Sequence, residues 1–262
     1  MKKEQDELSK AYVTNQLLSL GVKKGDVLLV HTSFRATRPV EGGPEGLIMA
    51  ILDAIGPEGT LVMPSWTEND NEVFDPSNTH VYPDLGVVAE IFWRLPGVAR
   101  SNHCFAFAAL GPKATYIVSD SLPIPPHIPE SPIGRVYELN GKVLLIGVNH
   151  DADTTIHLAE LLANVPYRVS RYCTVIQEEI PVRIEYGEND HCCLRFALVD
   201  EWLLEKGLQS EGYVGHAHSR LAKSKDIVEV ALKHLALDPL IFLHHPEGGC
   251  YECNKARKSI KS

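Results

Sequence analysis

The chain has 262 residues, of which 44% are hydrophobic and 23% charged, so it can bury a core without disulfide cross-links. Asp and Glu outnumber Lys and Arg by 34 to 25, which gives a formal net charge of -9 at pH 7. A negative field repels phosphate backbones, so a nucleic-acid partner is excluded and cationic ligands are favoured. The charged start, Met1–Lys10, lacks a signal-peptide pattern, and no apolar run reaches the roughly 20 residues of a membrane-spanning helix. We therefore expect a cytoplasmic protein with no membrane partner.

Helical and strand patterns alternate along the first half of the chain. Apolar side chains at helical spacing over Ser9–Leu20 precede a buried strand at Val27–Val30, and a helical pattern at Glu45–Ile55 precedes a strand at Thr60–Met63. Strand, helix and strand in this order form a parallel crossover unit. A further buried strand at Lys142–Val148 leads into another helix. The pattern predicts an α/β fold.

Prolines interrupt the stretch from about residue 65 to 132. A long irregular stretch inside a compact domain is more often a binding loop or lid than part of the scaffold. We therefore expect a single domain over residues 1–262 with a proline-rich insert at about 65–132. After it, Val175–Tyr186 alternates polar and apolar residues like an antiparallel strand pair, and Leu194–Lys206 and Ser224–Leu235 have helical patterns.

The segment from Gly147 to Glu160 carries the strongest local signal of chemistry. A buried strand ends at Val148, and ligands of open α/β sheets bind beyond the carboxyl ends of strands. His157 falls in the first turn of the following helix, where the helix dipole disfavours its cationic form, so it is a candidate general base. Glu160 lies three residues on, on the same helix face. The alternative is a histidine that only hydrogen-bonds within its own loop.

Two acidic loops also leave strand ends. Trp66–Glu72 follows one predicted strand, and Glu185–Asp190 follows another. If these loops converge with Asp151 and Asp153, they form an anionic cleft suited to a polycation. Taken singly, an acidic loop is more often only solvated.

Four of the six cysteines cluster late in the chain. Cys250 and Cys253 have the C-x2-C spacing that places two thiolates on one metal ion. The pattern predicts a structural zinc ion held by His191, Cys193, Cys250 and Cys253, and the alternative is a set of free buried thiols.

No dinucleotide-binding or P-loop glycine motif is present, so a phosphate-bearing cofactor would have to be held in another way. His31–Arg35 and Arg100–Phe105 combine small residues, hydroxyls and an arginine, and such groups can hold a phosphate. A turn rich in hydroxyls is the alternative for either segment.

Several segments together resemble the aminoglycoside 3-N-acetyltransferase family. They are LLVHTSFRATRPVEGGPEGL, GTLVMPSW, DLGVVAEIFWRLPGVARSNHCFAFAALG, PPHIPESPIGRVYEL and LLIGVNHDADTTIHLAE. The tail, with YGENDHCCLRFAL and DPLIFLHHPEGGCYEC, resembles the type IV branch, which acetylates apramycin as well as gentamicin-like drugs. The resemblance implies acetyl-CoA as the donor. It also implies the antibiotic N-acetyltransferase fold, distinct from GNAT acetyltransferases, with a central mixed sheet flanked by helices.

The resemblance further implies roles for individual residues. His157 takes a proton from the 3-amino group as that group attacks the thioester, Thr155 is a candidate donor to the oxyanion, and Glu188, with Glu160 second, is the carboxylate that orients His157. The implied drug-binding residues are Asp70, His127, Glu188 and Asp190. The implied CoA-binding residues are His31, Thr32, Ser33, Phe34, Arg35, Ser101 and His103.

Other hypotheses stay open at this point. The chain could be an acyl-CoA N-acyltransferase that acts on another amine, a non-catalytic binder of cationic drugs, or a zinc-dependent hydrolase built on the His and Cys residues. The expected partners are an aminoglycoside and acetyl-CoA, with the chain a monomer or a homodimer.

Overall fold

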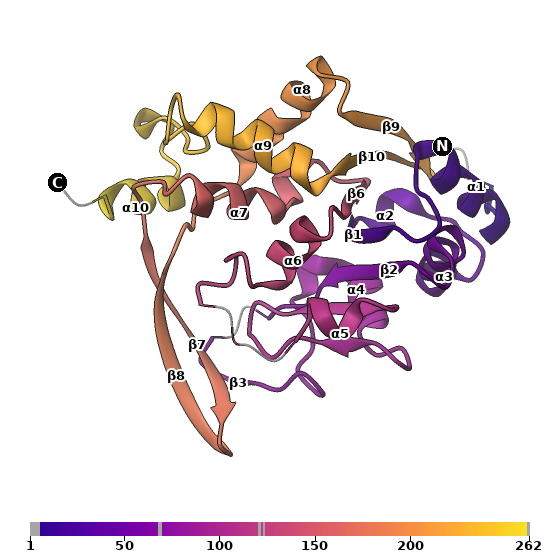
Figure 1. The fold of residues 1–262 in the computed structure, drawn as a ribbon, viewed down its shortest axis with the longest axis horizontal. Coiled ribbons are helices and arrows are strands. Elements are labelled where there is room, and N and C mark those ends of the chain that lie inside the picture. Colours follow the sequence, from indigo (N-terminus) through magenta and orange to yellow (C-terminus); the bar gives the residue numbers. More distant parts are fainter. Residues whose placement is uncertain (1–5, 68–69, 120–121, 123, 261–262) are drawn as a thin grey trace, which may run out of the picture.

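The computed structural model describes residues 6–67, 70–119, 122 and 124–260, and in this part of the chain seven strands form a central mixed sheet (Figure 1). Across the sheet the strands are β4 (Ala99–Arg100), β5 (Phe107–Leu110), β2 (Thr60–Pro64), β1 (Val27–Thr32), β6 (Lys142–Ile146), β10 (Ala217–Lys223) and β9 (Gln209–Val214). β1 is parallel to both β2 and β6, whereas β10 is antiparallel to β6 and to β9. The predicted α/β class and mixed sheet are confirmed.

Helices cover both faces of this sheet. They are α1 (Lys10–Leu20), α2 (Phe34–Thr37), α3 (Gly43–Ile55), α4 (Gly86–Phe92), α5 (Ala114–Ile117), α6 (Pro132–Glu138), α7 (Thr155–Leu162), α8 (Leu198–Glu205), α9 (Ser224–Leu235) and α10 (Tyr251–Lys258). Short 3-10 turns are η1 (Pro83–Leu85), η2 (His150–Ala152), η3 (Leu194–Ala197) and η4 (Pro246–Gly248). Of the helices in the described residues, none has the length and apolar character that crossing a bilayer requires.

Two apolar cores lie on opposite faces of the sheet, because successive side chains of a strand point to opposite sides. Leu28 and Val30 of β1 pack in one core with side chains of α1, α3 and α4. Leu29, between them, packs in the other core with side chains of α5, α6, α7 and α9. The result is a three-layer α/β/α arrangement that places the ends of β1 and β6 side by side.

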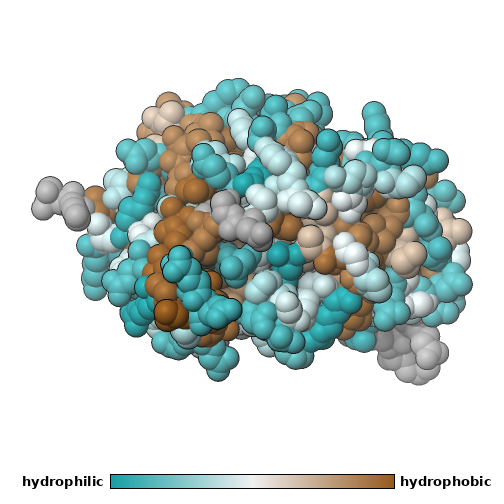
Figure 2. All heavy atoms as spheres, turned by 60° about the horizontal axis from the view of Figure 1, so that its bottom comes forward, coloured by the Kyte–Doolittle hydropathy of each residue, from teal (hydrophilic) through white to brown (hydrophobic). Residues whose placement is uncertain are grey.

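A long hairpin of β7 (Val169–Gln177) and β8 (Ile180–Glu188) projects from the body, with β3 (Val73–Phe74) paired to β7 (Figure 1). It contains the antiparallel pair predicted at 175–186, but it begins earlier and ends later. Phe74, Cys104 and Cys173 form part of a small third core beneath it. Figure 2 shows the face on which the hairpin lies, where hydrophobic residues gather in separate groups framed by hydrophilic ones.

The proline-rich stretch differs from the expected insert, because part of it is scaffold. β5 pairs antiparallel with β2, and β4 pairs with β5, so this stretch supplies one edge of the central sheet. The physical reason is the apolar run Phe107–Ala109, whose side chains are all fully buried. Residues 68, 69, 120, 121 and 123 of the stretch lie outside the described residues.

Arg100 stabilises this stretch through hydrogen bonds to backbone carbonyl groups. Its guanidinium donates to the carbonyl oxygens of Ser65 at 2.5 Å and Thr79 at 2.6 Å, and it lies 4.4 Å from the ring centre of Trp93. Burial lowers the pKa of Arg100 to about 10, which still leaves the group charged at neutral pH. Both terminal nitrogens are therefore used by the scaffold, and Nε is buried, so Arg100 is not placed to hold a phosphate.

We expect Arg100→Met to lower the free energy of unfolding by about 1–3 kcal/mol, because it leaves carbonyl groups of Ser65 and Thr79 without their charged donor. Urea unfolding of wild type and variant measures the difference. Arg94→Met is the matched control: Arg94 lies over the same Trp93 ring, but its side chain is 42% exposed. Equal unfolding midpoints for Arg100→Met and wild type would contradict this role.

Candidate active site

The loop between β6 and α7 places His157 in the first turn of a helix, as predicted. Gly147, directly after β6, has a φ of +67°, and a Cβ there would lie 2.8 Å from that of Ala36, so the chain can leave the sheet here only at glycine. Asp153 Oδ1 accepts the backbone amide of Thr155 at 2.9 Å, which begins α7. The other oxygen of Asp153 lies 2.9 Å from His150 Nδ1, so the turn is fixed on both sides.

Glu160, and not Glu188, contacts His157, which corrects the expected order of the two carboxylates. His157 Nδ1 lies 2.8 Å from Glu160 Oε2. Glu188 Oε1 instead lies 3.1 Å from Nδ1 of His127. The reason is geometric: Glu160 follows His157 by three residues on one helix, whereas Glu188 arrives from the end of β8 on the far side of His127.

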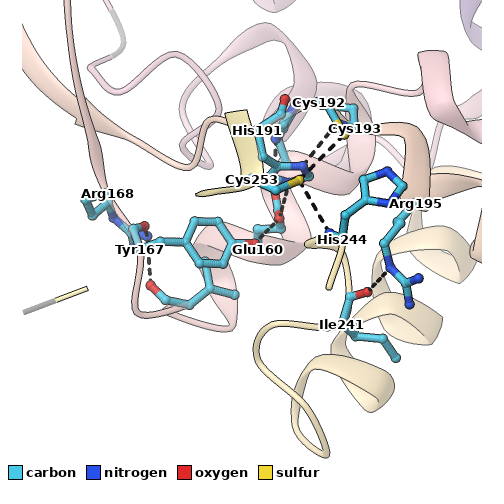
Figure 3. Close-up of polar contacts among 12 residues, drawn as sticks. Glu160, Tyr167, Arg168, His191, Cys192, Cys193, Arg195, Ile241, His244 and Cys253 are labelled. Atoms are coloured by element: carbon cyan, nitrogen blue, oxygen red, sulfur yellow. Dashed lines mark hydrogen bonds and ion pairs between the residues drawn. The ribbon is translucent and has the colours of Figure 1, made fainter. Parts of the chain in front are cut away.

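Glu160 is fully buried and accepts three hydrogen bonds. Besides His157, its partners are His191 Nε2 at 2.8 Å and the hydroxyl of Tyr167 (Figure 3). Burial raises the pKa of this carboxyl, but His191 and His157 outweigh it and hold the pKa at about 2. Glu160 is therefore a carboxylate throughout the physiological pH range.

The two nitrogens of the His157 imidazole have different partners, a carboxylate and a thiol. Nδ1 is directed at Glu160, and Nε2 lies 3.4 Å from Cys193 Sγ, so Nε2 is the atom that can accept a proton. Burial lowers the pKa of His157, but Cys193 and Glu160 outweigh burial and raise it well above its ordinary value. This differs from the expectation that the helix start alone keeps the ring neutral, because Cys193 and the Glu160 carboxylate, both in contact with the ring, favour its protonated form.

His157 lies where two cavities adjoin. A cavity of about 290 Å³, the central cavity, and one of about 360 Å³, the acidic cavity, share the lining residues Trp66, Phe105, His157 and Asp190. The central cavity also includes His31, Thr32, Pro64, Asp84, Leu85, Val148, Asp151, Ala152, Asp153, Thr154 and Cys193. The acidic cavity also includes Thr67, Asp70, Arg171, Tyr186, Glu188, Asn189 and Glu252.

Carboxylates from separate segments meet in the acidic cavity. Asp70, Glu188 and Asp190, three of the predicted drug-binding residues, all line it. Arg171 offsets part of their charge, because its guanidinium lies 2.5 Å from Asp190. Burial raises the pKa of Asp70. The expected convergence with Asp151 and Asp153 is found only in part: those two residues line the central cavity with Trp66 and Asp190, whereas Asp70 and Glu188 line the acidic cavity alone.

His127, the fourth predicted drug-binding residue, lies behind Glu188 and lines neither cavity. It is buried, and its ring stacks on that of His157 with 4.7 Å between ring centres. Its contact with Glu188 lowers the pKa of that carboxyl despite burial. The position therefore suits support of Glu188 and His157 more than direct contact with a ligand.

A groove of about 580 Å³ continues from the central cavity along the ends of β1 and β6. Ser33, Phe34, Arg35 and Arg38 line it, and we call it the basic groove. Thr32 lines both the groove and the central cavity, so the predicted segment 31–35 follows one continuous path. His31, at the central cavity, has its pKa lowered to about 4 by burial and is neutral at pH 7.

Ser101 and His103 do not join this path, which corrects their predicted role. Ser101 Oγ accepts the backbone amide of Phe107 at 2.9 Å, and His103 Nδ1 accepts that of Phe105 at 2.8 Å. Both side chains are buried and line none of the three cavities. Arg100 points into the protein at this stretch, and the side chains of Ser101 and His103 accept hydrogen bonds from backbone amides of the same stretch.

Thr155 is also buried, and among the described residues its hydroxyl has no hydrogen-bond partner. It lines none of the three cavities, whereas the preceding Thr154 lines the central cavity with Oγ1 3.4 Å from His31 Nε2. Sequence pattern alone does not distinguish two adjacent threonines. Sequence pattern also carries no signal for Tyr167 or Arg171, whose partners Glu160 and Asp190 belong to other elements of the chain.

The predicted four-ligand metal site is wrong, because its members face different ways. Cys193 contacts His157, and His191 uses both ring nitrogens: Nε2 for Glu160 and Nδ1 for the amide of Cys193, at 3.1 Å. Cys193 has a φ of +60°, and this turn separates its side chain from that of Cys192. Cys192, which the prediction omitted, is the thiol that lies near Cys250 and Cys253.

The family model for aminoglycoside 3-N-acetyltransferase matches residues 29–236. Aminoglycoside N(3)-acetyltransferase IV from Salmonella sp. is 63% identical over 245 residues, which are 94% of each chain. The crystal structure of a histidine-to-alanine mutant of AAC(3)-IVa in complex with a gentamicin has a TM-score of 0.97 and 61% identity, covering 99% of this chain and 100% of that one. The corresponding apramycin complex has a TM-score of 0.90 and 60% identity, covering 95% and 100%. The chain therefore belongs to the aminoglycoside 3-N-acetyltransferase family, close to its type IV members, as the sequence motifs predicted.

Proposed function

We propose that this chain transfers the acetyl group of acetyl-CoA to the 3-amino group of aminoglycosides, and that this reaction gives antibiotic resistance. The observation that carries the proposal is the position of His157, whose single reactive nitrogen lies between the acidic cavity and the path to the basic groove. The relatives solved with a gentamicin and with apramycin support aminoglycosides as the acceptors. We place the reaction in the cytoplasm, where acetyl-CoA is made.

The two charged substrates enter from opposite sides of His157. Arg35 and Arg38 in the basic groove attract the phosphates of CoA, as guanidinium groups commonly do. Asp70, Glu188 and Asp190 attract the ammonium groups of the drug into the acidic cavity. The thioester carbon and the 3-amino nitrogen then meet beside Nε2 of His157.

The chemical step is a direct transfer. The neutral 3-amino group attacks the thioester carbonyl while His157 Nε2 takes its proton, and the tetrahedral intermediate collapses to the amide and CoA thiolate, which is then protonated. Glu160 holds Nδ1 and stabilises the imidazolium that forms. Thr154, on the wall of the central cavity, is our candidate donor to the oxyanion, and the predicted Thr155, whose buried hydroxyl has no partner among the described residues but lines none of the three cavities, is the alternative.

The first test is release of CoA thiol from acetyl-CoA with apramycin, with gentamicin and with a drug that lacks a 3-amino group. Wild type should release thiol with the first two alone. His157→Ala should lower kcat by about 10²–10⁴-fold, the usual contribution of a positioned general base, with drug binding retained in calorimetry. No release with any drug would move the function to another amine acceptor, and a mutant rate within tenfold of wild type would exclude His157 as the base.

Glu160→Gln and Glu188→Gln together test which carboxylate serves the base. Protonated His157 cannot accept a proton, so kcat/KM falls as the pH drops through its raised pKa. Replacing the Glu160 carboxylate lowers that pKa, and we therefore expect the acidic limb of the profile to move to lower pH while kcat falls. Glu188→Gln should leave the limb in place and raise the KM for drug.

The substrate amine ionises identically with every variant, so the shift between the two pH profiles reports on the enzyme alone. If the acidic limb of the kcat/KM profile moved in Glu188→Gln and stayed in place in Glu160→Gln, Glu188 and not Glu160 would be the carboxylate that serves His157.

Asp190→Asn should raise the KM for drug about tenfold, a loss of ~1.4 kcal/mol, with a smaller change in kcat. The reason is that the change removes an anion from the acidic cavity and leaves Arg171 there uncompensated. Glu185→Gln is the matched control, since Glu185 lies on the same hairpin, is exposed and lines none of the three cavities. Steady-state kinetics with apramycin measures both, and an unchanged KM in Asp190→Asn would remove Asp190 from the drug site.

A further inference from the structure

Three cysteine thiols meet next to the active site without taking part in the proposed reaction. The Sγ atoms of Cys192, Cys250 and Cys253 all lie within 4.8 Å of one another, and those of Cys192 and Cys253 are 3.6 Å apart. Figure 3 labels Cys192 and Cys253 of this cluster. All six cysteines of the chain are free thiols. A disulfide would join only two of these three thiols, whereas one metal ion can bind all three.

The spacing of these sulfurs fits a shared metal ion. Two sulfurs bound to one tetrahedral zinc ion are ~3.8 Å apart, because each Zn–S bond is ~2.3 Å long. Two sulfurs in a disulfide are separated by ~2.0 Å. The distance between Cys192 and Cys253 therefore matches one edge of a zinc tetrahedron and not a covalent bond.

A backbone amide points at one of the sulfurs. The amide of His244 donates to Cys253 Sγ at 3.4 Å. Such a donor compensates part of the negative charge that thiolates keep when they bind a metal. Cys250 is partly exposed, so water can reach the remaining position of the tetrahedron.

We propose that Cys192, Cys250 and Cys253 bind a structural zinc ion as thiolates. The ion connects the loop after β8 to the start of α10, since Cys250 precedes that helix and Cys253 lies in its first turn. The segment between α9 and η4 has little regular structure of its own, and the ion holds its far end in place. Cys193, adjacent to Cys192, stays directed at His157.

The test is the zinc content of the full chain, purified with reductant and without chelator, by inductively coupled plasma mass spectrometry. We expect about one zinc ion per chain in wild type and its loss in Cys192→Ser and Cys253→Ser. Cys173→Ser is the matched control, because Cys173 belongs to a second group with His103 and Cys104 and should leave the zinc content unchanged. Zinc absent from wild type, kept in both cluster variants, or lost in Cys173→Ser would overturn the proposal.

A second measurement needs no substitution in the cluster, in case those variants fail to fold. Cobalt(II) added to metal-free wild type should give the strong sulfur-to-cobalt absorption of a thiolate site, and Cys173→Ser should give the same spectrum. Removal of zinc should lower the Tm, and added zinc should restore it. Absence of the sulfur-to-cobalt absorption, or a Tm unchanged by complete removal of zinc, would overturn the site or its structural role.

Discussion

The buried carboxylate of Glu160 is the constraint on which the active site depends. A charge taken out of water must be matched by donors, and removal of one partner from such a group is strongly destabilising. The donors come from three places: His157 lies on α7, and Tyr167 in the segment before β7 and His191 in the loop after β8 supply the other two. One carboxylate thus fixes these segments to each other and leaves Nε2 of His157 as the reactive nitrogen.

The charge of the chain is distributed so that two unlike substrates can meet. An overall excess of acidic residues attracts a polycationic drug but repels the phosphates of CoA, so the two must be bound in separate places. Asp70, Glu188 and Asp190 gather in one cavity, and Arg35 and Arg38 line the groove beyond the other. His157 lies between the two, and in the proposed reaction this is the place at which a neutral amine attacks a neutral thioester.

Local pattern predicted the parts of the site that depend on neighbouring residues. The strand end before the loop, predicted at Val148 and found at Ile146, the helix beginning near His157 and the continuous segment His31–Arg35 follow from periodicity and turn signals within short windows. The contact between Glu160 and His157 could also have been predicted in this way, because residues three apart on a helix lie on the same face. The family resemblance favoured Glu188 instead, and a resemblance identifies residues at a site without stating which of them touch.

The missed features depend on where distant segments meet or on one backbone angle. Arg100 has the pattern of a phosphate ligand until its carbonyl partners at Ser65 and Thr79 are known. His191, Cys192 and Cys193 show the second case, because three consecutive residues face Glu160, Cys253 and His157 in turn. The positive φ of Cys193 makes this possible, and no side-chain spacing encodes it. An irregular loop held on one side by a buried carboxylate, and on the other by a thiol cluster, can present Cys193 to the catalytic histidine as firmly as a helix could.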